Sequence, residues 1–241
     1  MNDNLIIKQK DLIENPTPRV AVCLVLDCSP SMSGEVNYGS IIQQTNQRPI
    51  DALNEGVRCF FTAVKEDEIA KYSVEIAVVS FSGKAKIVLD FQSIENVDIP
   101  TLELDMEHGG TSIGTAVKLT LELLNKRKNE YKEAGVDYYQ PWLVLMTDGQ
   151  PTDDTHKDVS KTVRELINTE KLTIFPIAIG DGADMEVLSM FSPKRTPLKL
   201  KGLKFNDFFE WLSQSISPIP QSIPGEVIPL NKDGIKGWTE L

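Results

Sequence analysis

Histidine, cysteine and long apolar runs are all scarce in this 241-residue sequence. The two histidines, His108 and His156, and the three cysteines, Cys23, Cys28 and Cys59, show no paired spacing that would suit zinc, so none is assigned to a metal. The odd number of cysteines favours reduced, structural thiols. No apolar stretch approaches membrane-spanning length and the first residues do not resemble a signal peptide, so we expect a cytoplasmic protein.

Positive charge is also in deficit. The chain has 25 Lys and Arg against 35 Asp and Glu, a formal net charge of −10, and an acidic surface repels nucleic acid phosphates and anionic membranes. We therefore expect neither as a partner. The densest basic cluster could dock an acidic partner, but a solvated face is the simpler interpretation and no role is assigned to it. Its members are Lys194, Arg195, Lys199, Lys201 and Lys204.

The sequence does contain alternating strand and helix patterns. Val20–Leu26 is continuously apolar, as expected of a central strand buried on both faces. After it, apolar residues recur at spacings of three and four from Ile50 to Val64, which predicts an amphipathic helix. The alternation continues, and it predicts a doubly wound, mostly parallel open α/β sheet with helices on both faces. Further strands are expected at 74–81, 85–91, 142–146, 172–180 and 198–200, and further helices at 112–132, 158–168, 184–190 and 206–217.

This pattern fills residues 19–217 and leaves an N-terminal extension, 1–18, and a proline-rich C-terminal tail, 218–241. The sequence allows two alternatives for the tail: it lies across the domain with Trp238 as an anchor, or it is a loose linker. Pro176 is awkward inside an interior strand because proline has no backbone donor.

The candidate chemistry follows the two most apolar runs, both of which end in aspartate. The first continues as DCSPS, with Asp27, Ser29 and Ser31, and the second as TDGQPTDD, with Asp148. Ligands of open α/β sheets bind beyond the carboxyl ends of the strands, where carboxylate and hydroxyl oxygens suit a hard cation such as Mg²⁺. A third segment, GGTSIGTA, carries Thr111. Each segment alone is more simply explained as a turn or, for the third, as a glycine loop in which Thr111 or Ser112 caps the following helix. Only their combination in this order indicates a site.

With these segments in order, the chain resembles the von Willebrand factor A domains over about residues 19–217. The resemblance implies a metal-ion-dependent adhesion site in which Asp27, Ser29, Ser31, Thr111 and Asp148 hold the cation, some directly and others through water. It also implies a divalent cation, Mg²⁺ first with Mn²⁺ or Ca²⁺ as alternatives, that captures an Asp or Glu of a partner protein. Within the family, LVLMTDGQPTDD, GGTSIGTA and FFEWLSQSIS most resemble the intracellular, tellurium-resistance TerY-type proteins of bacterial stress-response gene clusters.

The segment Glu35–Gln47 departs from the compact loop that the family leads one to expect. It begins only four residues after Ser31, which keeps its start near the site, so we predict that it touches the partner; Tyr38, Ile41 and Ile42 are its candidate anchors. A surface loop without a role is the alternative.

Two other functions compete with metal-dependent binding. The segment IGDGADMEVL resembles the acidic segment of haloacid-dehalogenase-type phosphatases, which also carry an Asp after a strand. Their DxDx[TV] motif needs a second Asp as acid/base, and the chain has Ser29 there, which cannot transfer a proton at neutral pH. We therefore expect no enzymatic activity. The other competitor is a scaffold whose metal only ties loops together.

Overall fold

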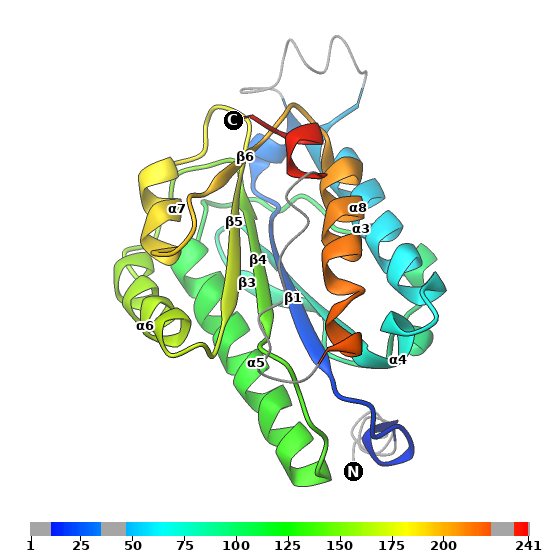
Figure 1. Ribbon diagram of the computed structural model, residues 1–241. Helices are drawn as coiled ribbons and strands as arrows, with labels where there is room; N and C mark the ends of the chain where they lie inside the picture. The colour runs from blue at the N-terminus through cyan, green and yellow to red at the C-terminus, as the bar shows by residue number, and fades with distance from the viewer. Residues whose placement is uncertain (1–10, 35–46, 223–233, 241) are drawn as a thin grey trace.

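The computed structural model describes residues 11–34, 47–222 and 234–240, so the predicted partner loop Glu35–Gln47, Gln47 apart, lies outside the described residues. Within those ranges seven strands form one sheet in the order β3-β2-β1-β4-β5-β6-β7 (Figure 1). They are β1 (Val20–Asp27), β2 (Val74–Phe81), β3 (Ala85–Leu89), β4 (Trp142–Thr147), β5 (Thr173–Ile179), β6 (Leu198–Leu200) and β7 (Thr239–Glu240).

The five inner strands, β2, β1, β4, β5 and β6 in their order across the sheet, pair in parallel. In the described sheet only the two edge strands, β3 and β7, run antiparallel to their neighbours. From β1 the chain passes first to β2 and β3 on one side and then to β4, β5 and β6 on the other. The prediction of a doubly wound, mostly parallel sheet is thus confirmed, and its topological switch point lies between β1 and β4.

Helices cover both faces of this sheet. In Figure 1, α3 and α8 lie together on one face, and α5, α6 and α7 lie on the other. The α-helices are α3 (Pro49–Glu66), α4 (Ala70–Ser73), α5 (Ile113–Ala134), α6 (His156–Asn168), α7 (Met185–Phe191) and α8 (Phe205–Ile216). Short 3₁₀ helices are η1 (Pro30–Ser33), η2 (Ile94–Asn96), η3 (Ile99–Thr101), η4 (Ile219–Gln221) and η5 (Gly234–Gly237).

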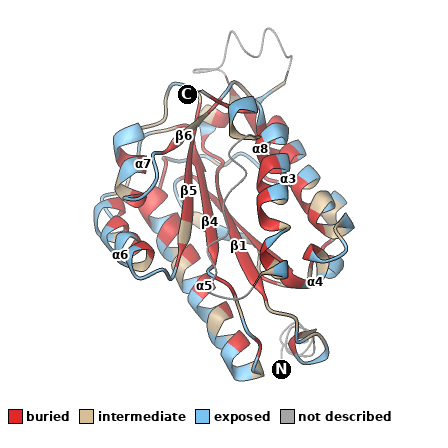
Figure 2. Ribbon diagram, viewed as in Figure 1, coloured by how far each residue is buried: buried red, intermediate tan, exposed pale blue. Residues whose placement is uncertain are grey.

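β1 shows why the central strand is continuously apolar. Its residues alternate between the two faces, so Val22 and Leu24 join the core under α3 and α8, while Cys23 and Val25 join the core under α5 and α6. Every residue of β1 is buried, and Figure 2 shows the same for the centre of the sheet. A polar residue within this strand would have been buried on either face.

Pro176 lies within β5, opposite Leu145 of β4. The pairing of β5 with β6 begins only at the next residue, Ile177, so Pro176 has a neighbouring strand on one side only. The position therefore tolerates a residue without a backbone donor.

The tail packs against the domain in its described part. Trp238 is fully buried, with its ring 4.9 Å from that of Phe208 and 5.2 Å from that of Trp211, both on α8. Its carbonyl accepts a 2.7 Å hydrogen bond from the backbone N–H of Lys201, beside the pairing of β7 with β6. Of the two alternatives that the sequence left open, the structure shows the anchored one. None of the helices in the described ranges combines the length and apolarity needed to cross a bilayer.

Candidate metal centre

The sheet topology brings the two aspartates together. Asp27 is the last residue of β1, and Asp148 follows the last residue of the neighbouring parallel strand β4. The pairing of Leu26 with Met146 sets the register, so both carboxyl groups lie at the carboxyl edge of the sheet, at the switch point. Both are fully buried, although each lies where a strand passes into a loop.

Asp27 is held by one hydrogen bond on each oxygen. Its Oδ1 accepts from the backbone N–H of Ser29 at 2.9 Å, and its Oδ2 accepts from the hydroxyl of Thr147 at 2.6 Å. These bonds fix the carboxylate at the mouth of the β1–β4 pair. Thr147 was not among the predicted site residues; its position directly before Asp148 is the only sequence signal for it.

The hydroxyls of the first motif link it to the second aspartate. Ser29 Oγ and Ser31 Oγ lie 2.9 Å apart and share a hydrogen bond, and Ser31 Oγ donates to Asp148 Oδ1 at 2.7 Å. Ser29 occupies the N-cap position of η1, where its side chain makes no capping hydrogen bond, and Ser31 lies within this single turn. Four of the five predicted residues thus form one continuous hydrogen-bonded group together with Thr147.

Thr111 is brought to the group from the loop before α5. Its backbone N–H donates to Thr152 Oγ1 at 2.9 Å, and its carbonyl accepts from the N–H of Thr152 at 3.0 Å. Its hydroxyl oxygen would lie 2.9 Å from a Cβ added at Gly149, directly beside Asp148. Thr111 therefore reaches the same site, although its hydroxyl makes no hydrogen bond to the other four residues.

Two glycines allow this close approach. A Cβ added at Gly110 would lie 2.2 Å from Thr152 Oγ1. Gly109 has a φ of 144°, and a Cβ added there would lie 2.6 Å from the Cα of Gly83. Any larger residue at either position would displace the loop that carries Thr111.

Asp153 completes the loop in a way that the sequence did not indicate. The sequence alternative was that Thr111 or Ser112 caps the helix, but neither side chain does; Ser112 Oγ donates instead to the carbonyl of Gly83 at 3.0 Å. The carboxylate of Asp153 accepts from the backbone N–H groups of Gly114 and Thr115, at 3.2 and 2.8 Å. A residue from the second motif thus caps α5.

The electrostatics of the group favour a cation. Burial first, and the charge of Asp148 second, raise the pKa of Asp27 from 3.8 to about 7, and the hydrogen bonds from Thr147 and Ser29 only partly offset this. Among the described residues, Asp27 forms no ion pair with a Lys, Arg or His. A nearby cation would offset both the burial of the Asp27 carboxylate and its repulsion by Asp148.

The donor set is compatible with a hard divalent cation because every side-chain donor is a carboxylate or hydroxyl oxygen. In the part of the chain that the structure describes, no three His, Cys, Asp or Glu side chains gather as a metal site, so this candidate depends on its hydroxyls. Neither histidine makes a hydrogen bond to the candidate ligands among the described residues. His156 Nδ1 contacts the carbonyl of Asp153 at 2.5 Å, and His108 is an exposed loop residue.

A doubly wound sheet with an oxygen-rich site at its switch point defines the chain as an α/β domain built to present a polar site beyond its strands. The chain belongs to the von Willebrand factor type A domain family, whose model matches residues 21–208. Members of this family are generally protein-interaction modules. Comparison with curated proteins gives no match.

Solved structures share the fold at low sequence identity. Proximal thread matrix protein 1 from the mussel byssus is 20% identical, with a TM-score of 0.57 over 83% of this chain and 48% of that one. A von Willebrand factor type A protein from Catenulispora acidiphila is 15% identical, with a TM-score of 0.53 over 82% and 42%. The manganese-loaded TRAP protein of Plasmodium vivax is 18% identical, with a TM-score of 0.52 over 74% and 64%. The chain thus spans about half the length of the mussel protein.

Proposed function

We propose that Asp27, Ser29, Ser31, Thr111 and Asp148 hold one divalent cation, Mg²⁺ in the first instance. The observation that carries this proposal is the hydrogen bond from Ser31 to Asp148, which joins the two motifs into one oxygen-lined group around a buried pair of carboxylates. The manganese in the Plasmodium vivax structure supports a divalent cation in this fold. Bound there, the cation would supply an electrophilic position that accepts one more oxygen ligand.

We propose further that this ligand is an Asp or Glu carboxylate of a partner protein. Two carboxylates formally neutralise a divalent cation, and the hydroxyls add only dipoles, so an incoming carboxylate remains favourable. The surroundings are accessible: Asp105, Met106 and His108, on the loop that leads to Thr111, are exposed, and Met106 is 41% exposed. An exposed apolar residue beside a charged anchor is the kind of feature that binding surfaces use.

The proposed role is binding and not catalysis. The aspartates of the acidic segment that resembles a phosphatase motif make structural contacts. Asp184 accepts hydrogen bonds from the N–H groups of Glu186 and Val187 as the N-cap of α7, and Asp181 pairs with Lys199. Ser29 shares its hydroxyl hydrogen bond with Ser31. These contacts support a site without an acid/base residue.

The cellular setting is proposed from sequence resemblance to the TerY-type proteins, which would make this an intracellular component of a tellurite or chemical stress response. A strain that lacks the gene should become more sensitive to tellurite. The wild-type gene should restore tolerance and the Asp148→Ala gene should not; equal restoration by both would separate any stress role from the metal site.

The binding function is tested by affinity capture with the full chain, once in Mg²⁺ and once in EDTA. We expect proteins that are recovered in Mg²⁺, lost in EDTA and lost with Asp148→Ala. Substitution of single Asp and Glu residues in a recovered partner then identifies the captured carboxylate. An identical set of proteins under all three conditions contradicts metal-dependent recognition, and metal binding without any such protein favours the scaffold alternative.

A further inference from the structure

A basic pocket lies at the opposite edge of the sheet from the candidate metal centre. It is a cavity of about 830 Å³ beside the first residues of β4 and β5, Trp142 and Thr173. The six residues of β4 separate this edge from Asp148, which at about 3.3 Å per residue amounts to about 20 Å. The pocket is therefore distinct from the metal centre.

Cations dominate the lining of the basic pocket. Five basic side chains line it, from α5, from the turn after α6 and from the loop before β6. Glu170 supplies the only carboxylate among the described residues that line the pocket. None of the five forms an ion pair with a carboxylate in the described part of the chain. They are Lys128, Lys132, Lys171, Lys194 and Arg195.

This charge is unusual for a chain whose net charge is −10. Two other members of the basic cluster form ion pairs: Lys199 contacts Asp181 at 2.5 Å and Lys204 contacts Asp207 at 2.9 Å. Lys194 and Arg195 instead line the pocket.

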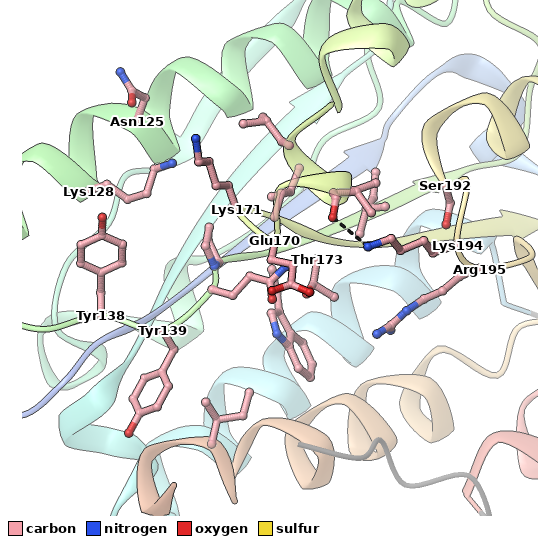
Figure 3. A pocket seen from close by; sticks show the side chains of 18 of the residues that line it. Asn125, Lys128, Tyr138, Tyr139, Glu170, Lys171, Thr173, Ser192, Lys194 and Arg195 are labelled. Atoms are coloured by element: carbon pink, nitrogen blue, oxygen red, sulfur yellow. Dashed lines mark hydrogen bonds between the residues drawn. The ribbon is translucent and has the colours of Figure 1, made fainter. Parts of the chain in front are cut away.

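Two of the cations are held by contacts with the protein, and three others lie near enough to repel one another. Figure 3 shows Lys128 and Lys171 on one side, and Lys194 and Arg195 pointing in from the other. Lys194 Nζ donates to the carbonyl of Ile167 at 3.2 Å, and the guanidinium of Arg195 lies 4.8 Å from the centre of the Phe175 ring. Burial, followed by the charges of Lys132 and Lys171, lowers the pKa of Lys128. This repulsion would be relieved by a bound anion.

The rest of the lining is mixed: Trp142 and Ile219 are apolar, and Asn125, Gln140 and Thr173 are polar. Trp142 and Tyr139 are buried, Ile219 closes one side, and the Tyr139 hydroxyl already donates to the carbonyl of Ser222 at 2.7 Å. The volume lies within the range of about 300–1,000 Å³ typical of small-molecule sites, and lysine ammonium groups bind phosphate oxygens as point charges.

We propose that the basic pocket binds a small molecule that carries several phosphate groups. The phosphates lie between the lysines of α5 and the 170–172 turn on one side and Lys194 and Arg195 on the other. The remainder of the ligand packs against Trp142 and Ile219. This site does not depend on the proposed metal-dependent function, because none of the five candidate metal residues lines it.

Calorimetric titration of the full chain in EDTA tests the proposal, because EDTA keeps divalent metals from the phosphates. Sodium tripolyphosphate and ATP are the two probes. We expect saturable binding to the wild type and a loss of affinity of about tenfold or more in Lys128→Gln/Lys171→Gln, since two charge-assisted contacts are removed. The matched control is Lys118→Gln, an exposed lysine of α5 outside the pocket, and its affinity should stay within about twofold.

The two probes divide the ligand's chemistry. Similar affinities for tripolyphosphate and ATP show that the phosphates alone suffice, and tighter ATP binding shows that a base also contacts the apolar wall. A melting curve confirms that the double variant is folded. Absence of saturable binding to the wild type, or equal weakening in Lys118→Gln, contradicts the proposal. Binding of a hexaglutamate peptide when neither phosphate probe binds would make the pocket a docking site for acidic protein segments and overturn it.

Discussion

The hydroxyl of Ser31 donates a 2.7 Å hydrogen bond to Oδ1 of Asp148, across 117 residues of sequence. This bond joins the segment after β1 to the segment after β4 at the switch point of the sheet. Because Asp27 and Asp148 are both fully buried there, the site combines high local negative charge with low access to water. The stability of the domain should therefore differ strongly with and without a bound cation.

Asp27→Asn should stabilise the metal-free chain at alkaline pH. The folded-state pKa of Asp27 is about 7 against an ordinary 3.8, so ionisation of this buried carboxyl destabilises the folded state. The cost is absent below about pH 4, grows as the pH rises, and levels off above pH 7 at up to about 4 kcal/mol. Melting curves in EDTA should thus show a higher Tm for the variant at pH 8 and a much smaller difference at pH 4.

Addition of Mg²⁺ provides the control for this pH effect. The cation should raise the Tm of the wild type at pH 8, because a ligand that binds only the folded state stabilises that state by mass action. It should leave the Tm of Asp27→Asn nearly unchanged, because the variant lacks one of the two charged ligands. A variant that is less stable than the wild type in EDTA at pH 8 would show that Asp27 is not electrostatically strained.

Gly149→Ala should weaken metal binding without unfolding the domain. The new Cβ would lie 2.9 Å from Thr111 Oγ1, so the threonine must shift by a few tenths of an ångström away from the site. We expect an affinity for Mg²⁺ about tenfold lower by calorimetry, as for a displaced ligand. Gly237→Ala is the matched control, since a Cβ there meets nothing within 4 Å. Equal affinities in the two variants would place Thr111 outside the site.

The chain should not hydrolyse phosphate esters. The position where a phosphatase needs its acid/base Asp holds Ser29, and Asp184 is occupied as a helix cap. An assay with p-nitrophenyl phosphate and Mg²⁺ should give no turnover above the blank. Turnover that disappears in Asp27→Asn would support the enzyme alternative.

Replacement of Glu35–Gln47 by a short Gly-Ser linker should weaken capture of the partner and spare the affinity for Mg²⁺. The segment follows Gly34, the C-cap residue of the helix η1 that carries Ser31, and all five candidate ligands lie outside it. Capture is measured by the Mg²⁺-dependent affinity experiment and metal binding by calorimetry. Loss of both would indicate that the loop is structural, and unchanged capture would rule out its proposed role.

The strands and helices of the domain could be predicted because their apolar patterns are strong. Val20–Leu26 and Val74–Phe81 appear as strands nearly as expected. Burial on both faces favours a mainly apolar sequence, which is unbroken in the first strand and interrupted by the buried Glu75 and Ser80 in the second. β7 could not be predicted in this way, because two residues carry no periodicity and the strand follows Trp238, which packs its ring against Phe208 of α8. Only the tertiary structure shows that contact.

The sequence indicated the candidate ligand residues, but it did not indicate the neighbouring residues whose hydrogen bonds hold the loops of the site. Asp27 and Asp148 each end an apolar run, so their meeting follows from the topology of a parallel sheet. The cap of α5 by Asp153 joins residues 39 positions apart, and Thr147 bonds to an aspartate 120 positions away. No local pattern signals such contacts, because they arise only when separate loops fold against one another.

Calorimetric titration of Mg²⁺ into the metal-free full chain at pH 8 tests the central claim most directly. We predict one saturable site in the wild type and an affinity lower by about a hundredfold or more in both Asp27→Ala and Asp148→Ala, because each removes a charged oxygen ligand. Asp158→Ala, which removes an exposed carboxylate of α6 paired with Lys161, should bind as the wild type does. Unchanged affinity in both site variants, or no saturable binding to the wild type, would contradict the assignment of this metal centre.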